Sequence, residues 1–331
     1  MAQRRGSDPG DWASASHPGV GPWVGIAANA ASGRGAGRVA VDRLVRELNR
    51  LGVDTRIAWT LPERAALVAE ATPDAGCRCL VAAGGDGTVA ALINEQPSVP
   101  IAVMPVGTEN LFARHFGFVR QPRLAAARIA TGEASSLDLG RVGDRRFALM
   151  AGIGFDADVV SRHHNARVGR SGSMRPTNRA AYVEPVLRSS FGYRFPPLHL
   201  TIEEAEGGCE SLVGSTAFVF NLPRYALGLP FAPTARGDDG WLDLVVFRDP
   251  GPFRALHYLW LVVSGQHRNR SGIIHRRVRR VTVEVDEPVP VQLDGDPGGQ
   301  ILPGMSPPWT AEIEADALGV VAPAVSAVAA S

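Results

Sequence analysis

One acidic residue enclosed by glycines is the strongest chemical signal in the sequence. Residues 83–88 read Ala-Gly-Gly-Asp-Gly-Thr and join an apolar run to a helical pattern. Glycines let the main chain approach a ligand closely, and the N–H groups at a helix N-terminus attract phosphate. Asp86 would repel phosphate, so we predict a catalytic residue that holds Mg²⁺ beside it. The predicted phosphate ligands are Gly84, Gly85, Gly87 and Thr88. The alternative is an ordinary turn capped by Asp86 or Thr88.

Two further polar loops follow other predicted strands. Residues 29–33 come after the first apolar run, and residues 105–110 come after the fourth. In a parallel sheet the carboxyl ends of the strands lie along one edge, where ligands bind. The predicted nucleotide ligands in these loops are Asn29, Ser32, Gly107, Thr108 and Asn110. Each loop alone could equally be a plain turn.

The first third of the chain alternates strand and helix patterns. Strands are expected at 23–28, 53–59, 79–83 and 101–104, and helices at 39–48, 62–71 and 88–94. Strands separated by helices indicate a parallel sheet that helices cover on both faces. We therefore expect an α/β nucleotide-binding domain over residues 22–132, preceded by a flexible tail over 1–21.

The remainder of the chain is rich in strand patterns. They lie at 136–142, 146–151, 198–203, 213–220, 241–247, 281–285 and 289–293, with helices expected at 156–165 and 252–264. Short strands divided by Gly and Asp turns are typical of antiparallel sheets. This part predicts a β-rich, mostly antiparallel sandwich domain over 133–315, followed by a C-terminal tail over 316–331.

Composition narrows the class of protein. The 331 residues are 45 % hydrophobic and 20 % charged, with a net charge of +1 and three cysteines. This favours a globular chain in a reducing compartment, with no global attraction to nucleic acid. No apolar stretch is long enough to span a bilayer. We expect a cytoplasmic protein, at most peripheral at the inner membrane face, and leave a homodimer open.

Six segments in register across residues 22–315 carry a family resemblance. They are 29–33, 84–88, 107–113, 152–157 (Gly-Ile-Gly-Phe-Asp-Ala), 239–243 (Asp-Gly-Trp-Leu-Asp) and 293–296 (Leu-Asp-Gly-Asp). Together they resemble the diacylglycerol kinase catalytic-domain family, which includes bacterial lipid kinases, sphingosine kinases and ceramide kinases.

The resemblance implies two domains, with ATP, Mg²⁺ and a lipid meeting between them. It implies transfer of the γ-phosphoryl group to a lipid hydroxyl at a membrane surface, with Asp294 as the general base and Asp296 in the nucleotide site. It also implies a structural Mg²⁺ near Asp239 and Asp243. Taken alone, Asp294-Gly295 is typical of a hairpin turn, and the acids near Gly240 are typical of a solvated turn.

The sequence departs from the family pattern at several positions. Ala30 replaces a proline, Ala90 and Ala91 stand where bacterial members carry Asn-Glu, and Asp296 replaces a glutamate. Leu111 stands where diacylglycerol kinases carry the aspartate that follows asparagine in their Asn-Asp pair. Sphingosine kinases also have an apolar residue there. Residues 225–228 lack the usual glycine-rich stretch. The acceptor is therefore expected to be either a diacylglycerol-like or a sphingoid lipid.

Two other functions and one surface remain open. NAD kinases and phosphofructokinases share the Gly-Gly-Asp-Gly-Thr loop, and the departures suit a lipid-binding regulator that has lost catalysis. The arginine-rich segment 268–280 could contact an anionic membrane or form a solvated strand edge. It has no interleaved aromatic residues, so nucleic-acid binding is not expected.

Overall fold

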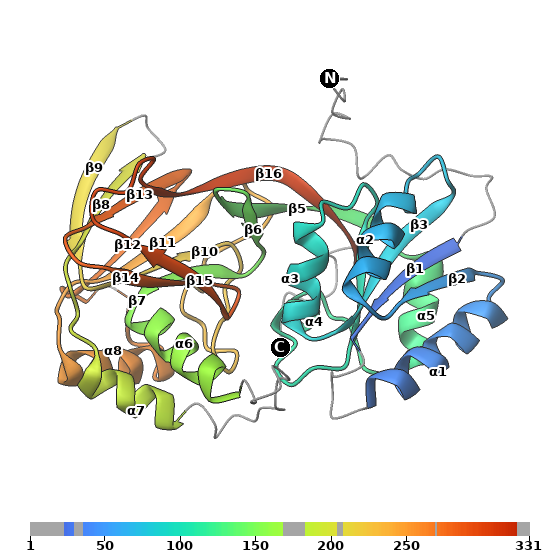
Figure 1. Cartoon of the computed structure of the whole chain (residues 1–331), viewed down its shortest axis with the longest axis horizontal. Coiled ribbons are helices and arrows are strands. Elements are labelled where there is room, and N and C mark those ends of the chain that lie inside the picture. Colours follow the sequence, from blue (N-terminus) through green and yellow to red (C-terminus); the bar gives the residue numbers. More distant parts are fainter. Residues whose placement is uncertain (1–22, 30–35, 168–182, 204–207, 269, 323–331) are drawn as a thin grey trace. The chain divides into compact units, whose positions relative to one another are not determined.

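The computed structural model describes residues 23–29, 36–167, 183–203, 208–268 and 270–322 (Figure 1). Ser32 and the expected tail over 1–21 lie outside these ranges. The chain divides into two compact units. Unit 1 contains the chain up to Asp138 and again from Ala315, and unit 2 contains Leu139–Glu314. Among the described residues, no helix has the length and apolar character needed to cross a membrane.

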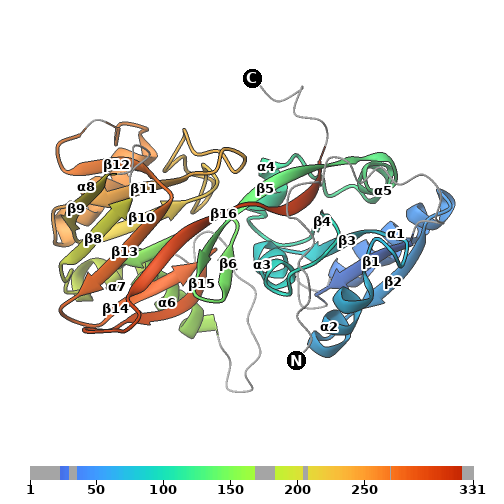
Figure 2. The same cartoon turned by 90° about the horizontal axis from the view of Figure 1, so that it is seen from above.

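Unit 1 is built on a parallel sheet. Its elements are β1 (Trp23–Ala28), α1 (Ala36–Arg50), β2 (Asp54–Ala58), α2 (Leu61–Glu70), β3 (Cys77–Gly84), α3 (Asp86–Asn94), β4 (Ile101–Pro105), α4 (Leu111–His115) and α5 (Pro122–Thr131). The strands lie in the order β2-β1-β3-β4, and every adjacent pair is parallel. Figure 2 shows α1 and α5 on one side of these strands and α2 and α3 on the other.

The sequence explains these elements. All six residues of β1 are buried, as expected for a strand that helices cover on both faces. Helix α1 buries Val41, Leu44 and Leu48, which recur at helical spacing. Helix α2 begins with a capping box in which Thr60 and Glu63 satisfy each other's main-chain N–H groups. The expected α/β class of this unit is confirmed.

Unit 2 contains two packed sheets. Its elements are the last part of β5 (Glu133–Val142), then β6 (Arg145–Phe147), β7 (Met150–Gly154), α6 (Phe155–Arg167), α7 (Val183–Gly192), β8 (Leu198–Glu203), β9 (Cys209–Gly214), β10 (Thr216–Phe220), β11 (Leu242–Phe247), α8 (Pro252–Val263), β12 (Ile273–Val278), β13 (Arg280–Val285), β14 (Val289–Leu293), β15 (Asp296–Ile301) and the first part of β16 (Trp309–Ala322). One sheet is six-stranded, in the order β12-β11-β10-β7-β14-β15, and fully antiparallel. The other contains β16, β13, β8 and β9.

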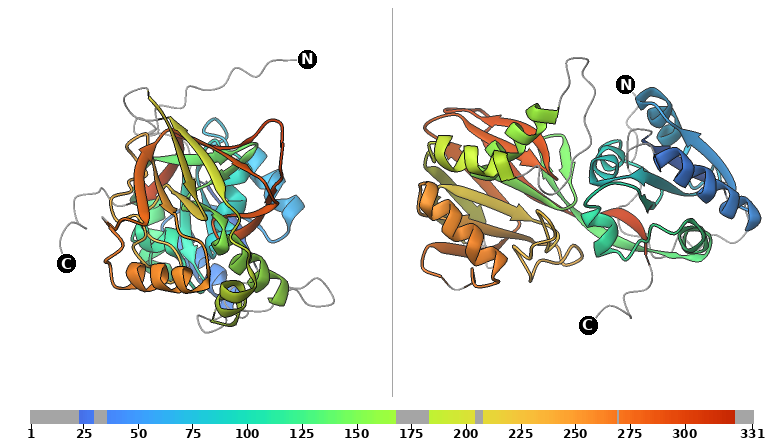
Figure 3. Two further views of the ribbon diagram at one scale, coloured as in Figure 1. Left: turned by 90° about the vertical axis from the view of Figure 1, so that its left-hand side faces the viewer. Right: turned by 90° about the horizontal axis from the view of Figure 1, so that it is seen from below.

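Apolar side chains from both sheets form the core of unit 2. Ile153, Val219 and Leu244 of the six-stranded sheet belong to the same buried cluster as Leu200 and Val283 of the other. Figure 3 shows α6, α7 and α8 on the outer face of the six-stranded sheet. The expected antiparallel β-rich domain is confirmed.

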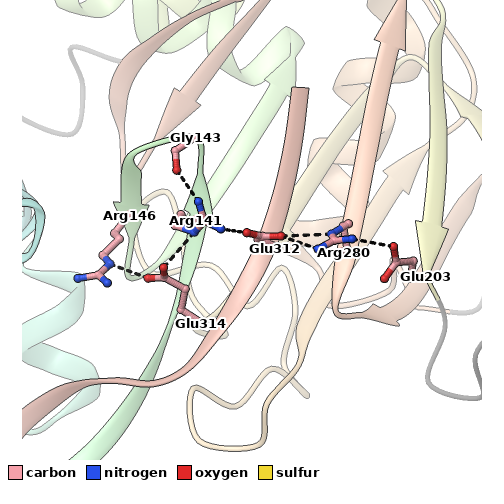
Figure 4. A network of polar contacts seen from close by, with 7 residues as sticks. All are labelled: Arg141, Gly143, Arg146, Glu203, Arg280, Glu312 and Glu314. Carbon is pink, nitrogen blue, oxygen red and sulfur yellow. Dashed lines mark hydrogen bonds and ion pairs between the residues drawn. The ribbon is translucent and has the colours of Figure 1, made fainter. Parts of the chain in front are cut away.

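A chain of ion pairs crosses the strands of unit 2 (Figure 4). Arg141 pairs with Glu312 and Glu314, and Arg280 pairs with Glu312 at 2.9 Å and Glu203 at 3.1 Å. Arg146 also contacts Glu314, at 2.6 Å. Opposite charges on neighbouring strands favour one register over its neighbours.

Four local features differ from the sequence-based expectation. The chain passes from unit 1 to unit 2 between Asp138 and Leu139, inside β5, whereas the expected boundary at 132–133 lies at the start of that strand. The expected tail from residue 316 begins inside β16, whose Val320 pairs with Ile101 of β4. The patterns did not predict α4, α5 or α7. The expected strand 213–220 is divided between two strands: before Ser215 the chain pairs with β8 as part of β9, and after Ser215 it pairs with β11 as β10. Long strands that change partners leave no composition signal at the point of change.

Candidate active-site residues

The predicted phosphate loop joins β3 to α3 at the carboxyl end of the parallel sheet. Gly85 is the extended N-cap residue, and α3 begins at Asp86. Thr88 is buried rather than exposed to a ligand, and its side chain packs against Gly84, where a Cβ would lie 2.1 Å from Thr88 Oγ1. Gly87 is exposed at the start of the helix. The local geometry is that of a strand, a glycine turn and a helix N-terminus, which suits phosphate.

The loop after β4 lies directly against the phosphate loop. The N–H groups of Val106 and Gly107 donate to the carbonyl oxygen of Gly84, at 2.9 and 3.3 Å. A Cβ on Gly107 would lie 2.5 Å from the Cα of Gly85, so this approach requires glycine. The first loop also reaches this place, because the Asn29 N–H donates to the Ala83 carbonyl at 3.2 Å. The structure thus brings the phosphate loop and the loop after β4 together and places Asn29, the described residue of the first loop, next to them; Asn29 and Thr108 are exposed.

Replacing Gly107 with alanine should separate these two glycine loops. The added Cβ would overlap main-chain atoms of Gly85, which cannot rotate away. We expect Gly107→Ala to weaken ATP binding about tenfold, equal to about 1.4 kcal/mol. Calorimetric titration with ATP would measure the change. The matched control is Gly192→Ala, where the added Cβ meets only the end of the Arg162 side chain at 3.6 Å. Equal ATP affinity in both variants would contradict the proposed close approach.

Asp86 holds the beginning of α4. Its Oδ2 accepts from the Leu111 N–H and its Oδ1 accepts from the Phe112 N–H, both at 3.0 Å. Burial raises the pKa of Asp86, the main-chain amides lower it, and the neighbouring charge of Glu109 raises it further. The net shift is upward. The turn before α4 contains Asn110 in the left-handed conformation at φ 51°, which asparagine tolerates better than most residues.

These contacts explain how leucine is accommodated at position 111, where the family pattern has an aspartate. The Leu111 side chain is buried, while its main-chain N–H supports Asp86. The Ala90 and Ala91 side chains cannot support Asp86 with a hydrogen bond, and main-chain amides provide that support instead. A carboxylate has about four acceptor positions. Two are used by the amides of Leu111 and Phe112.

The donor set at this edge fits a hard cation held mainly by phosphate. Asp86 and Glu109 are carboxylates close enough to interact electrostatically. Mg²⁺ is commonly bound through one or two carboxylates together with substrate phosphates and water. Among the described residues, no group of three or more His, Cys, Asp and Glu side chains is placed to hold a metal. The role of Asp86 as a metal ligand therefore stays a prediction.

Asn110 has an acceptor that nothing in the described part of the chain satisfies. Its amide nitrogen donates to the Gly107 carbonyl at 2.8 Å, a carbonyl that Arg120 also contacts at 2.5 Å. Its Oδ1 is buried and has no hydrogen-bond partner among the described residues. Leaving a buried acceptor unsatisfied costs about 1–3 kcal/mol, so a donor from a ligand or water would stabilise the loop. This is the atom we expect to contact a nucleotide.

In unit 2, Asp294 occupies a tight turn between β14 and β15. Asp294 and Gly295 both have positive φ, 53° and 87°, as in the hairpin turn that the sequence also suggested. The buried carboxylate accepts three main-chain hydrogen bonds, from Ala148 and Leu149 at 2.8 Å and from Met150 at 3.0 Å. The side chain thus ties this hairpin to the start of β7. Its role as a general base stays a prediction.

Sequence reasoning did not assign a role to Asp156, which forms a polar network beside Asp294. Gln292 is fully buried; its amide nitrogen donates to Asp156 Oδ2 at 2.9 Å, and its Oε1 accepts from the Gly295 N–H at 2.7 Å. A Cβ on Gly152 would lie 2.7 Å from both Asp156 Oδ2 and Gln292 Nε2, so glycine makes room for the pair. The Gly-x-Gly-Phe-Asp segment was the available signal for this network.

Residues 225–228 form a strained turn that contributes to the same network. Ala226 and Leu227 have φ of 39° and 65°, a conformation that costs free energy for residues with a side chain. Tyr225, at the start of the turn, hydrogen-bonds Asp156. The departure from a glycine-rich stretch thus leaves non-glycine residues in glycine-like conformations beside the network.

Asp156 should make stability depend on pH. Burial raises its pKa from 3.8 to about 6, partly offset by hydrogen bonds from Gln292 and Tyr225. The folded state therefore binds the proton more tightly than the unfolded chain. This stabilises the fold below about pH 4 and is lost as the pH rises through about 6. We expect the unfolding free energy of Asp156→Asn, relative to wild type, to increase over this interval in urea titrations. Parallel curves would contradict this assignment.

The acidic hairpin of the predicted structural metal site is paired with protein groups. Asp239 forms an ion pair with Arg277 at 2.5 Å and accepts from the Trp241 N–H at 3.2 Å. Asp243 is buried and accepts from the Thr234 hydroxyl at 3.1 Å. Burial raises the pKa of Asp243, and the charge of Arg277 opposes that shift. The alternative expected from the sequence was a solvated acidic turn; in the structure both acids bond protein groups, and a Mg²⁺ site here stays a prediction.

Asp296 begins β15 with an exposed side chain. Partial burial raises the pKa of Asp296, and the neighbouring His164, Arg145 and Arg167 oppose that shift without reversing it. Its predicted contact with the nucleotide stays a prediction. Asp296 shares a turn with Asp294, whereas the phosphate loop belongs to unit 1.

Comparison with known proteins agrees with these features. Residues 24–142 match the family model of the diacylglycerol kinase catalytic domain, and residues 150–322 match that of the YegS C-terminal NAD kinase beta sandwich-like domain. A "Diacylglycerol kinase" of Bacillus subtilis (strain 168) is 29 % identical over 68 % of this chain and 73 % of its own length. A "Probable lipid kinase YegS-like" protein of Pseudomonas aeruginosa (PAO1) is 29 % identical over 80 % of this chain and 85 % of its own length.

Solved structures share the fold. A crystal structure of a diacylglycerol kinase from Bacillus anthracis str. Sterne has a TM-score of 0.66 and 19 % sequence identity, and covers 91 % of this chain and 97 % of its own. The two family models together account for both units and for the phosphate loop, Asn110, Asp156 and Asp294. The chain therefore belongs to the diacylglycerol kinase catalytic-domain family and carries a YegS-type C-terminal domain.

Proposed function

We propose that this chain is an ATP- and Mg²⁺-dependent lipid kinase that phosphorylates a hydroxyl of a diacylglycerol-like or sphingoid lipid. The observation that carries the proposal is the phosphate loop. Gly85 and Gly107 approach so closely that neither tolerates a side chain without movement, at the N-terminus of α3. Such a turn presents N–H groups and a positive helix end to phosphate. Relatives named as diacylglycerol or lipid kinases support the choice of acceptor.

The chemical step requires a proton acceptor for the lipid. The hydroxyl oxygen forms a bond to the γ-phosphorus, the bond from that phosphorus to the β–γ bridging oxygen breaks, and ADP leaves. The hydroxyl proton passes to the carboxylate of Asp294. Mg²⁺, when bound, supplies charge neutralisation for the phosphates. Among this chain's residues, Asp86 and Glu109 would hold it, and Asn110 would orient the nucleotide.

Asp294 is suited to this role by its rigidity. Three main-chain amides fix its carboxylate, and Gln292 fixes the adjacent Gly295. Catalysis of phosphoryl transfer depends on positioning more than on covalent chemistry, so a fixed base is favoured over a mobile one. A lipid acceptor requires the enzyme to work at a membrane surface, and within the described part of the chain no helix is long and apolar enough to cross the membrane.

One observation favours a second candidate, a kinase of a soluble substrate such as NAD. The family model that covers residues 150–322 describes a sandwich like that of NAD kinases. The resemblance concerns the fold of unit 2, and fold alone does not decide the substrate.

Transfer of label from γ-labelled ATP tests the proposal. The acceptor panel would contain diacylglycerol, monoacylglycerol, ceramide, sphingosine and phosphatidylglycerol in mixed micelles, together with NAD. We expect Mg²⁺-dependent labelling of one of the lipids. Labelling of NAD alone would replace the proposal with the second candidate. Lipid binding without any labelled product would identify a regulator that has lost catalysis.

A further inference from the structure

Helix α8 of unit 2 is apolar on its inner and outer faces, yet its outer face is exposed. The inner face is buried through Tyr258, Leu261 and Val262. On the outer face, Phe253 is 78 % exposed, Trp260 54 % and Val263 59 %. Soluble helices normally place polar residues outward, and a helix that is apolar all round is normally buried. A large exposed apolar surface of this kind indicates a contact with another molecule or with a membrane.

The exposed residues recur at helical spacing. Phe253, His257 and Trp260 follow at intervals of four and three, so they lie along one stripe. The His257 and Trp260 rings stack with centroids 6.0 Å apart, and His257 is also exposed. We call the stripe Phe253, His257, Trp260 and Val263 the α8 face.

Helix α7 adds a second exposed apolar pair. Leu187 is 48 % exposed and Phe191, one turn later, is 65 % exposed. The two helices contact each other, and the right-hand view of Figure 3 shows both on the side of unit 2 nearest the viewer. The apolar area is therefore larger than that of a single helix.

The segment of sequence that contains α8 carries only positive charge. Residues 250–283 contain seven arginines and no aspartate or glutamate. Four of these arginines have partners inside unit 2: Arg276 with Glu210, Arg277 with Asp239, Arg280 with Glu203 and Glu312, and Arg279 over the Trp241 ring. For these four strand-borne arginines of the segment 268–280, the partners favour the alternative of a strand edge over a membrane contact.

The remaining three arginines flank the α8 face. Arg254 is in the first turn of α8, and its only acidic contact among the described residues is a long one to Asp249, at 3.8 Å. Arg268 and Arg270 follow the end of the helix and are exposed. On α7, Arg188 is exposed and paired with Glu184 at 2.9 Å. Apolar and aromatic side chains flanked by arginines match the interface of an anionic bilayer, where rings enter the headgroup region and guanidinium groups meet phosphates.

We propose that the α8 face is the membrane-docking surface of this protein and that its partner is a bilayer containing anionic lipids. The proposal rests on the proposed lipid-kinase function, since it explains how unit 2 reaches an acceptor that does not leave the membrane. A protein partner would more often be met by a surface with a polar rim of both charges. Here Arg254, Arg268 and Arg270 give the two ends of the helix a positive excess, and the neighbouring acids Asp249 and Glu184 each lie beside an arginine.

Vesicle co-sedimentation tests the surface directly. The full-length protein would be mixed with phosphatidylcholine vesicles containing about one third phosphatidylglycerol, and with vesicles of phosphatidylcholine alone. We expect binding to the anionic vesicles that weakens with salt. The double variant Phe253→Ala, Trp260→Ala should lower the partition coefficient about tenfold or more. The matched control is Val213→Ala, Leu302→Ala, two residues of unit 2 that are 52 % and 50 % exposed away from α8.

A phosphorylation assay with a dispersed substrate separates membrane binding from catalysis. Both double variants should phosphorylate a short-chain diacylglycerol or sphingosine, kept below its critical micelle concentration, at the wild-type rate. If vesicle binding is lost only in the α8 variant, the docking surface is supported, even if no lipid is phosphorylated. Equal vesicle binding by wild type and the α8 variant overturns it. Light scattering that shows a wild-type dimer and a monomeric α8 variant, without vesicle binding by either, assigns the face to a second copy and overturns the bilayer.

Discussion

Asp294→Asn is expected to lower kcat for lipid phosphorylation by about a hundredfold to ten-thousandfold, the usual contribution of a general base. The affinity for ATP should stay within about twofold of wild type, because the base acts on the acceptor hydroxyl rather than on the nucleotide. Rates with labelled ATP and calorimetric titration of ATP would measure the two quantities separately. A variant with wild-type kcat would show that Asp294 is not the base.

The same substitution should also affect stability, and this effect has to be separated from catalysis. The carboxylate accepts hydrogen bonds from the amides of Ala148, Leu149 and Met150. An asparagine NH₂ group would face at least one of these donors without bonding it, which costs about 1–3 kcal/mol. The matched control is Ser215→Ala. It removes a buried hydroxyl that donates to the Phe247 and Asp249 carbonyls, also in unit 2.

Comparison of the two variants identifies the role of Asp294. Urea unfolding should show that both lose stability, while kcat falls only in Asp294→Asn. If kcat falls equally in Ser215→Ala at matched stability, the loss reflects the fold of unit 2 rather than proton transfer. This design therefore distinguishes a base from a residue that only ties the hairpin to β7.

Asp86→Ala is expected to raise the KM for ATP by at least about tenfold and to remove the Mg²⁺-dependent part of ATP binding. Two losses combine in this variant. The carboxylate that would hold the cation disappears, and the N–H groups of Leu111 and Phe112 at the start of α4 lose their acceptor. Calorimetric titration of ATP with and without Mg²⁺ would measure the effect.

The variant Asp86→Asn separates the two losses. Asparagine retains one acceptor for the α4 amides but carries no charge, so it should recover part of the stability and none of the Mg²⁺ dependence. If the Mg²⁺ dependence of ATP binding is the same in wild type and both variants, the metal role of Asp86 is wrong, and its function is to hold α4. Recovery of Mg²⁺-dependent binding in Asp86→Asn would lead to the same conclusion.

Much of the nucleotide-binding unit was predictable from local sequence. The apolar runs of β1, β3 and β4 are continuous because helices cover both faces of the sheet, and such runs are visible without a structure. The glycine loop 84–88 was also recognisable, since glycine, acid and helix pattern lie side by side in the chain. These features depend on neighbours in sequence, so sequence reports them.

The partners of the site residues could not be predicted in the same way. Asp86 lies 25 residues from Leu111, and Asp294 lies 145 residues from Leu149, yet each pair is hydrogen-bonded. The donors are main-chain N–H groups, which every non-proline residue carries, so residue type gives no signal for them. The Asp156–Gln292 bond joins two side chains that lie 136 residues apart in the chain, and local sequence patterns do not report a pairing over that separation.

The sequence by itself determined the α/β and β-rich classes, the glycine loop and the positions of the acids that we expect to act in catalysis. Only the tertiary structure decided that Asp86 supports α4, that Asp294 is tied to β7, and that four of the arginines in 268–280 are used within unit 2 while those flanking α8 face outward. The physical reason is that composition and periodicity record which side chains can be buried or charged. Pairing across long loops is decided by which main-chain groups the folded sheets bring within hydrogen-bond distance.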